Sequence, residues 1–361
     1  MDTRSTSTRQ PTTYRLGELF SGPGGLAVGA HLANIGNGDR IAHQWATDYD
    51  ADTVKTYAAN IPGASAESVV LSDIRELDYQ VLHDLGDIDA LAFGFPCNDF
   101  SVVGEQKGFN GEFGPLYTYG VKALKEFQPK WFLAENVGGL RSANEGAAFV
   151  KIQHDLREAG YKLVTNLYKF EQYGVPQARH RIIIIGIRDD IDRAYRVPST
   201  EPFEDADVSV RTALTVPPIT PDMSGTEKTR QSATVVERLK LIKPGQNAFT
   251  ADLPEHLQIK TATKISQIYK RLHPDQPAYT VTGSGGGGTH MYHWDEPRAL
   301  TNRERARLQT FPDDFNFHGS KEQVRKQIGM AVPAKGAQVI FEAVMKTMAG
   351  IDYPSQEANM D

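Results

Sequence analysis

The fold of this chain is decided by residues 90–101, which read Ala-Leu-Ala-Phe-Gly-Phe-Pro-Cys-Asn-Asp-Phe-Ser and contain the single cysteine, Cys97. The apolar run 90–93 is too short for a helix, so it predicts a buried strand of a parallel sheet. Gly94 and Pro96 end that strand. Cys97 therefore follows the carboxyl end of a strand, where open α/β sheets bind their ligands. A lone cysteine is more often a small buried hydrophobic side chain, so its position alone does not make it a nucleophile.

The composition indicates a globular protein with two domains, or with one large domain and an insertion. The chain has 361 residues, of which 40% are hydrophobic and 23% are charged. A single cysteine excludes a disulfide framework. No apolar run approaches the roughly 18 residues that cross a membrane, and residues 1–13 lack the apolar centre of a secretion signal. We expect a cytoplasmic protein whose residues 1–13 form a disordered tail.

A glycine-rich turn follows the first predicted strand. Residues 14–20 alternate as a strand does, residues 21–27 read Ser-Gly-Pro-Gly-Gly-Leu-Ala, and an apolar helix follows. Strand, glycine-rich turn and helix together can hold a nucleotide-like ligand against backbone amides. Gly22, Gly24 and Ala27 fit the loose dinucleotide pattern, although a tight turn without a ligand explains them equally well.

Acidic residues follow the next two predicted strands. Asp48 ends a strand over 44–47, where a carboxylate can accept hydrogen bonds from ribose hydroxyls. Asp50 precedes a helix over 51–59 and suits its N-cap. We therefore assign the ribose to Asp48 and the cap to Asp50. Asp73, after a third strand, would accept from an adenine amino group unless it is only a turn residue.

A second carboxylate is expected beside Cys97. Glu135 follows the apolar strand 131–134, and the carboxyl ends of neighbouring parallel strands meet at one edge of a sheet. Facing a thiol across a crevice, Glu135 could act as a general acid, although carboxylates at strand ends are often simply solvated. The glycine-rich loop 101–114 is long enough to close over such a site.

Two arginines precede the very apolar strand 182–187. Arg179 and Arg181 are two residues apart, so in an extended segment both side chains point the same way. The alternative is a pair of exposed cations at a sheet edge. The other elements expected in this half are helices over 116–127 and 147–159 and a strand over 162–168.

The character of the chain changes after Arg188, where prolines accumulate and the alternation of strand and helix stops. We place a domain boundary near residue 190 and a smaller domain over 191–324. An apolar helix over 335–348 indicates that the chain returns to complete the catalytic domain, 14–190, with about residues 325–350.

The smaller domain has a basic segment in a chain whose net charge is −6. Residues 228–271 hold nine Lys or Arg against three Asp or Glu, a local excess of +6. Phosphate contact is one interpretation, and a solvated surface without a partner is the other. The glycine stretch over 280–289 would let the backbone approach a ligand closely.

In their order along the chain, these segments resemble the motifs of the DNA (cytosine-5)-methyltransferases. The resemblance covers about residues 14–188 and 271–345. The matching segments are 20–25 for the cofactor, 94–97 for the nucleophile, 135–137 for the acid, 177–181 for the Q-x-R-x-R motif, and 285–288, 303–315 and 328–333 for the last motifs.

The resemblance implies an α/β, Rossmann-like methyltransferase domain with a smaller, mostly irregular or β target-recognition domain. It implies methyl transfer from S-adenosylmethionine to carbon 5 of a flipped cytosine in a specific double-stranded DNA sequence, with S-adenosylhomocysteine as product and no metal. It further implies a bacterial monomer that can pair with a restriction endonuclease. It assigns the base to Cys97, Glu135, Arg179 and Arg181, and the cofactor to Phe20, Ser21, Gly22, Gly24, Gly25, Asp48, Tyr49, Asp73, Ile74, Pro96 and Leu116.

The chain departs from the family pattern at two positions. Asn98 stands where the family commonly has glutamine, and Met330 stands where it usually has asparagine. Met330 removes a polar group expected near the cofactor, whereas neither change touches the reacting groups. Two alternatives stay open at this point: a transfer-RNA methyltransferase, and a non-catalytic binding module on the same fold. The retained Cys97 and Glu135 argue against the second.

Overall fold

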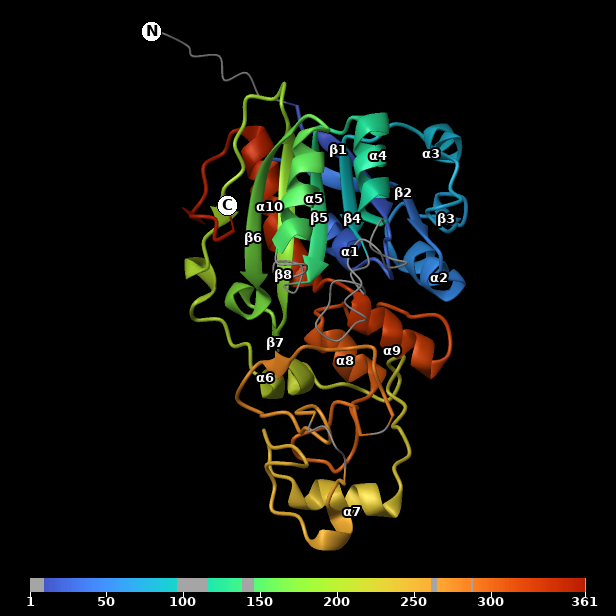
Figure 1. The fold of residues 1–361 in the computed structure, drawn as a ribbon, viewed down its shortest axis with the longest axis vertical. Helices are drawn as coiled ribbons and strands as arrows, with labels where there is room; N and C mark the ends of the chain where they lie inside the picture. The colour runs from blue at the N-terminus through green and yellow to red at the C-terminus, as the bar shows by residue number, and fades with distance from the viewer. Residues whose placement is uncertain (1–9, 96–115, 138–145, 261–264, 287, 361) are drawn as a thin grey trace.

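A seven-stranded sheet forms the centre of the larger domain in this computed structural model, and a smaller domain lies at one end of it (Figure 1). The structure describes residues 10–95, 116–137, 146–260, 265–286 and 288–360. Pro96, Cys97 and the predicted lid over 101–114 lie outside the described residues. Residues 1–9 of the predicted tail also lie outside the described residues, whereas Thr13, which was expected to belong to the tail, is the first residue of the first strand.

The strands lie in the order β3-β2-β1-β4-β5-β8-β6. Neighbours are parallel except for β8, which runs antiparallel to both β5 and β6. Because β1 has β2 on one side and β4 on the other, the strand order reverses there, and open α/β sheets bind ligands at such a point. The strands are β1 Thr13–Leu19, β2 Arg40–Asp48, β3 Val69–Leu71, β4 Ala90–Gly94, β5 Trp131–Val137, β6 Tyr161–Lys169 and β8 His180–Arg188.

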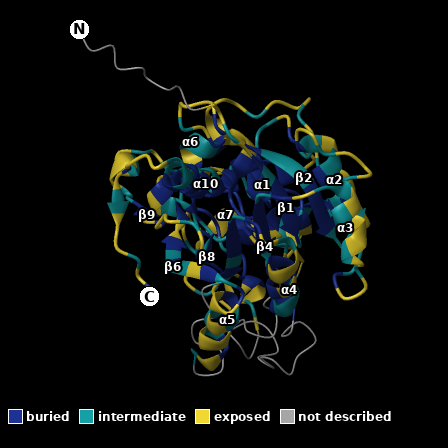
Figure 2. Ribbon diagram, turned by 90° about the horizontal axis from the view of Figure 1, so that it is seen from above, coloured by how far each residue is buried: buried dark blue, intermediate teal, exposed yellow. Residues whose placement is uncertain are grey.

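Helices cover both faces of the sheet, and the buried residues form its centre (Figure 2). Along β4, Ala90 and Ala92 pack in the cluster of α1 and α10, whereas Leu91 and Phe93 pack in the cluster of α3, α4 and α5. This alternation is what a pleated strand buried on both faces requires. The helices of the larger domain are α1 Gly25–Leu32, α2 Ala51–Asn60, α3 Tyr79–Leu85, α4 Tyr117–Phe127, α5 Ala147–Arg157 and α10 Ala334–Ala349.

The close packing of α1 against α10 depends on two glycines. A Cβ at Gly25 would lie 2.3 Å from the carbonyl oxygen of Val332, and one at Gly29 would lie 2.5 Å from the Cβ of Ala337. Larger residues would push the helices apart. The last long helix therefore packs on the first one.

The segment Lys321–Ala349 is long and apolar enough to cross a membrane by length and composition, which the sequence analysis did not anticipate. In the fold, 67% of its most apolar window is buried. It also consists of two helices, α9 Lys321–Met330 and α10, separated at Pro333. These features are typical of a core segment of a globular domain.

The larger domain extends beyond the boundary placed near residue 190. Tyr195 and Val197 belong to the core of α1 and α10, and Phe203 packs against Tyr173 of that core. Two short strands also join this segment to the end of the chain: β9 Val197–Pro198 and β11 Ser355–Gln356. The boundary near 190 is therefore too early, because these apolar side chains complete the larger domain.

The smaller domain is mostly irregular, and helices provide most of its regular structure among the described residues. The β content expected for it is limited to β10 Ala278–Tyr279, which pairs with β7 Gln177–Ala178, and a few isolated bridges. Its helices are α6 Val210–Thr215, α7 Ala233–Leu241 and α8 Asn302–Leu308, and α9 lies beside α8. It has a core of its own, which includes Leu239, Leu257 and Tyr292.

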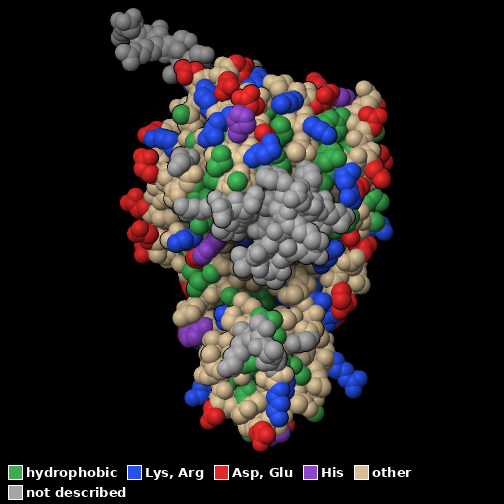
Figure 3. All heavy atoms as spheres, in the orientation of Figure 1, with side chains coloured by type: hydrophobic (Ala, Val, Ile, Leu, Met, Phe, Trp, Pro, Cys, Tyr) green, Lys and Arg blue, Asp and Glu red, His purple; other side chains and the backbone are tan. Residues whose placement is uncertain are grey.

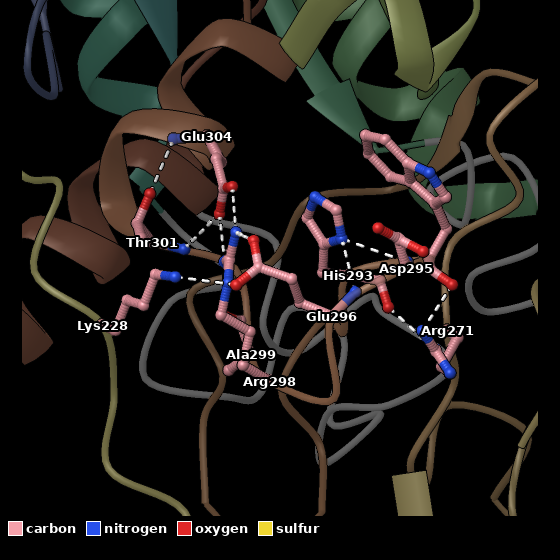
Figure 4. A network of polar contacts seen from close by, with 10 residues as sticks. Lys228, Arg271, His293, Asp295, Glu296, Arg298, Ala299, Thr301 and Glu304 are labelled. Atoms are coloured by element: carbon pink, nitrogen blue, oxygen red, sulfur yellow. Dashed lines mark hydrogen bonds and ion pairs between the residues drawn. The ribbon is translucent and has the colours of Figure 1, made fainter. Parts of the chain in front are cut away.

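Arginine side chains hold this irregular backbone together (Figure 4). The Arg271 guanidinium donates to the carbonyls of Leu239, Ile242, His293 and Trp294. Arg271 is only 5% exposed. A buried donor that serves four carbonyls takes the place of the hydrogen bonds that a sheet would provide.

A second network in the same view closes the start of α8 (Figure 4). Arg298 forms a two-pronged contact with Glu304, with distances of 2.7 and 2.8 Å. Glu304 and Thr301 also make a reciprocal capping box at the helix start. Glu296 links Arg298 to Lys228, at 2.8 and 2.7 Å.

Several of the described cations of the basic segment 228–271 are buried or paired. Arg238 and Arg271 are buried and donate to backbone carbonyls, and Lys228 is paired with Glu296. On the face seen in Figure 3, Lys and Arg side chains are interspersed with Asp and Glu. The local excess of positive charge in the sequence therefore overstates the charge that this region presents to a partner.

Candidate active site

Glu135 and Arg181 form an ion pair near the carboxyl edge of the sheet. Glu135 lies in β5, Arg181 lies in β8, and Nε of Arg181 is 2.9 Å from Oε1 of Glu135. Both side chains are 13% exposed. Two neighbouring strands thus present a carboxylate and a guanidinium side by side, in a position shielded from most of the solvent.

The same edge carries the segment that leads to Cys97. Gly94 of β4 is in register with Glu135 of β5, which confirms that these two strands are neighbours and parallel. A Cβ at Gly94 would lie 3.1 Å from Oε2 of Glu135, so glycine leaves room for the carboxylate. The Asn136 side chain donates to the carbonyl of Phe95, at 3.2 Å, and both residues are buried. The backbone two residues before Cys97 is therefore tied to the strand that carries Glu135.

Arg179 lies deeper than Arg181. Its guanidinium is 2% exposed and donates to the carbonyls of Val281 and Met330, at 3.1 and 3.3 Å. Burial lowers the pKa of Arg179, and the charge of Arg181 lowers it further. The side chain joins the Q-x-R-x-R segment to the glycine stretch and to the end of α9. This contact makes Arg179 a structural link as well as a candidate base-binding residue.

The glycine-rich turn is strained and open. Phe20 has φ +54° and Gly22 has φ +55°, and for a phenylalanine that conformation costs on the order of 1–3 kcal/mol. A Cβ placed at Gly22 would meet no atom within 4 Å. The amide of Gly22 donates to Oδ2 of Asp48, at 2.9 Å, and the amide of Ser21 donates to the carbonyl of Thr47. The turn is therefore fastened to the end of β2.

The acidic residues at the ends of β2 and β3 each have different hydrogen-bond partners. Asp50 caps α2 through the amide of Thr53, at 2.9 Å, as predicted. Asp48 accepts the amides of Gly22 and Asp50, and burial raises the pKa of Asp48, an effect that these two hydrogen bonds partly offset. The Arg75 guanidinium donates hydrogen bonds to both carboxylate oxygens of Asp73, at 3.0 and 2.6 Å. This pairing lowers the pKa of Asp73 and already occupies the carboxylate expected to meet an adenine.

The apolar residues assigned to the cofactor differ in their surroundings. Ile74 and Leu116 are buried in the cluster of α3, α4 and α5, and Phe20 packs against that cluster. Tyr49 is 60% exposed, directly after β2. Gly25 faces Ala331 and Val332, the residues just before α10, so its missing side chain allows this close approach, whereas a Cβ at Gly22 would meet no described atom within 4 Å.

Glu18 is a residue whose role the sequence analysis missed. It is 1% exposed, one position before the end of β1, and accepts from the hydroxyl of Tyr57 at 2.5 Å. The chain of contacts continues through Tyr57 to His43, at 3.2 Å, and from His43 to Ser68, at 2.9 Å. Burial raises the pKa of Glu18 to about 7. A carboxylate among the buried residues of a strand was the signal that could have identified it.

Glu18 is expected to make stability depend on pH. Its pKa is about 7 in the fold and about 4.3 in an unfolded chain. The stabilisation it provides is present below the unfolded pKa and is lost as the pH rises through 7. In the Glu18→Gln variant, the free energy of unfolding relative to wild type is expected to increase by about 3 kcal/mol between pH 5 and pH 8.

Urea unfolding of both proteins across this range measures the difference. His43, whose pKa burial lowers to about 4, is present in both proteins, so its own pH dependence cancels. A difference that stays constant with pH would contradict the raised pKa of Glu18.

Comparison with known proteins shows which family the chain belongs to. Residues 14–346 match the family model described as C-5 cytosine-specific DNA methylase. The chain belongs to this family. The methylase is also 56% identical over 358 residues to the Type II methyltransferase M.BbvI of Brevibacillus brevis, with 96% of this chain and 95% of that protein covered. It is 38% identical to the Type II methyltransferase M.NgoFVII of Neisseria gonorrhoeae, with 91% and 85% covered.

Solved structures give the same fold. A DNA modification methyltransferase encoded within an Escherichia coli prophage superposes with a TM-score of 0.72 at 24% identity, covering 93% of this methylase and 99% of that chain. The methylase is thus a DNA (cytosine-5-)-methyltransferase with the Rossmann-like fold and the S-adenosylmethionine dependence of its family. Among the described residues, no group of three or more His, Cys, Asp or Glu could hold a metal ion.

Proposed function

We propose that this methylase acts on a cytosine flipped out of a specific double-stranded DNA sequence, through a covalent bond between Cys97 and carbon 6 of the base. The observation that carries the proposal is the ion pair between Glu135 and Arg181. Glu135 is in register with Gly94, which stands three residues before Cys97 in the sequence. A carboxyl group and a guanidinium at one edge can hold the polar side of a cytosine while a thiol attacks its ring.

The chemistry needs these residue types because carbon 5 of cytosine is a poor nucleophile. Addition of the Cys97 thiolate to carbon 6 moves the electrons of the 5,6 double bond onto carbon 5. A thiol with a pKa of about 8.5 is only a few per cent thiolate at neutral pH, so its surroundings must favour the anion. A protonated Glu135 would hydrogen-bond ring nitrogen 3, Glu135 would also accept from the amino group, and Arg181 would hold oxygen 2.

The protein itself is unchanged at the end of the catalytic cycle. S-adenosylmethionine supplies an electrophilic methyl group when it is bound. Once carbon 5 carries the methyl group, its proton leaves to a base such as water. The electrons of that carbon–hydrogen bond re-form the double bond, and the bond between Cys97 and carbon 6 breaks to return the thiolate. Because these atoms are inaccessible in a stacked duplex, the base must leave the helix, at a cost of a few kcal/mol.

The cofactor is assigned to the point where the strand order reverses. The open turn at Gly22 and the exposed ring of Tyr49 fit a ligand with a ribose and an aromatic base. Asp48 lies at the end of β2 beside this turn, where its carboxylate would accept from the ribose hydroxyls in addition to the backbone amides that it already accepts. Phe20, Ile74 and the other residues assigned by the family resemblance complete this set: Ser21, Gly24, Gly25, Pro96 and Leu116. Asp73 belongs to the set as well, provided that its carboxylate exchanges the Arg75 guanidinium for the adenine amino group when the cofactor binds.

The relatives support a proposal for the cellular setting. Two of them are named Type II methyltransferases, which supports a pairing of this enzyme with a restriction endonuclease in a bacterial cytoplasm. We propose that it acts as a monomer, because methylation of one cytosine needs a single set of the residues described above.

The test is transfer of a labelled methyl group from S-adenosylmethionine to mixed DNA and to transfer RNA, with wild type and Cys97→Ala. We expect label in DNA as 5-methylcytosine with wild type only, while both proteins bind the cofactor alike. Label in RNA alone would contradict the DNA assignment. Label in DNA with Cys97→Ala at the wild-type rate would contradict the covalent route.

A further inference from the structure

Helix α9 connects three parts of the molecule through consecutive residues. The Arg325 guanidinium donates to the carbonyl of Gly283, at 3.2 Å, in the glycine stretch. Gln327 is buried and accepts from the hydroxyl of Thr56 in α2, at 2.8 Å. Between them, the ammonium of Lys326 lies 5.9 Å from the ring centre of Tyr49.

Helix α9 is held in place by close contacts on two of its sides. A Cβ on Gly329 would lie 2.0 Å from the amide nitrogen of Gly283, so the helix and the glycine stretch touch through their backbones. On the other side, the amide of His318 donates to the hydroxyl of Thr56 at 2.8 Å, and Gln327 donates to the carbonyl of His318 at 2.8 Å. The helix is therefore fastened to α2, whose start carries Tyr49 and Asp50.

Lys326 faces an aromatic ring and a carboxylate at that corner. Tyr49 is 60% exposed, so its ring is open to solvent over much of its surface. Burial acts to raise the pKa of Asp50, but the hydrogen bonds from Thr53 and, to a smaller extent, the charge of Lys326 outweigh burial and lower this pKa. The attraction between the cation and the ring face favours one orientation of an exposed ring, and the nearby negative charge of Asp50 favours keeping the cation there.

We propose that Lys326 is a positioning residue for cofactor binding, which holds the Tyr49 ring in the orientation that meets the aromatic base of S-adenosylmethionine. The inference rests on the proposed cofactor role of Tyr49. A ring that is already oriented loses less conformational freedom when the ligand binds. The attraction also strengthens when the ligand excludes water from the ring.

The test measures the Kd of S-adenosylmethionine by calorimetry on the full chain without DNA. We expect Lys326→Met to weaken binding about 3- to 10-fold, with a higher KM and an unchanged kcat at saturating cofactor. Lys326→Arg keeps the cation and is expected to restore the affinity. Lys321→Met is the matched control, because this lysine of the same helix donates to the carbonyl of Glu227 instead.

A double-mutant cycle with Tyr49→Leu decides how Lys326 acts. If Lys326 works through the ring, Lys326→Met has no further effect on Kd once Tyr49 is leucine. An equal loss in both backgrounds, or no loss in wild type, overturns the proposal. If Tyr49→Leu leaves Kd unchanged while Cys97→Ala abolishes methyl transfer, the role of Lys326 is overturned and the proposed function stands.

Discussion

The Arg271→Met variant is expected to unfold the smaller domain while the larger domain stays folded. Four backbone carbonyls lose their donor in this variant, those of Leu239, Ile242, His293 and Trp294. A buried polar group without a partner costs about 1–3 kcal/mol, so the loss is on the order of 4 kcal/mol or more. The larger domain has its own cores on the two faces of the sheet, and none of these four residues belongs to them.

Chemical unfolding followed by circular dichroism, together with limited proteolysis, measures this effect. We expect a transition at lower denaturant that wild type lacks, loss of DNA binding, and retained binding of S-adenosylmethionine. Lys240→Met is the control, because this substitution at an exposed position of α7 removes the same charge from the same domain. Arg271→Lys is expected to be intermediate, since one ammonium has three donors for four carbonyls. A single wild-type transition for Arg271→Met would contradict the role described here.

The Glu135→Gln variant is expected to lose about 10²- to 10³-fold in kcat while it binds cofactor normally. Glutamine has nearly the same shape, so the packing against Gly94 is kept. It cannot protonate ring nitrogen 3, and it removes the charge that pairs with Arg181 at 2.9 Å. The loss therefore reports chemistry rather than folding.

Single-turnover methylation of DNA measures this rate. Glu171→Gln is a matched control, because Glu171 also pairs with a residue of β8, His180, at 2.7 Å. We expect that control to keep its activity. Since Glu135 and Arg181 act on the same base, the double variant Glu135→Gln, Arg181→Met is expected to lose less than the product of the two single losses. A Glu135→Gln enzyme with a third or more of the wild-type rate would contradict the assignment.

Short-range patterns predicted much of the larger domain. The apolar run at 90–93 lies in β4, which runs from Ala90 to Gly94. Asp50 caps α2 as its position before an apolar helix suggested. These features depend on a few neighbouring residues, so a local pattern is enough to identify them.

Long-range contacts were not predictable in the same way. Arg238 and Arg271 look like surface cations in the sequence, but both are buried against carbonyls of distant segments. The segment with Tyr195 and Val197 looks like the start of the smaller domain, but it packs on the core of the larger one. No local pattern distinguishes these outcomes, because the partners are far away along the chain.

The sequence by itself determined the succession of strands and turns along the chain in the larger domain. It also determined the nucleophile candidate Cys97 and the carboxylate Glu135. Each of these depends on residues that are adjacent in the chain. Only the tertiary structure decided that Glu135 pairs with Arg181, that Arg179 joins two distant segments, and that Lys326 reaches Tyr49. The physical reason is that hydrogen bonds and charge attractions act across a few ångströms of space, and folding sets those distances independently of separation along the chain.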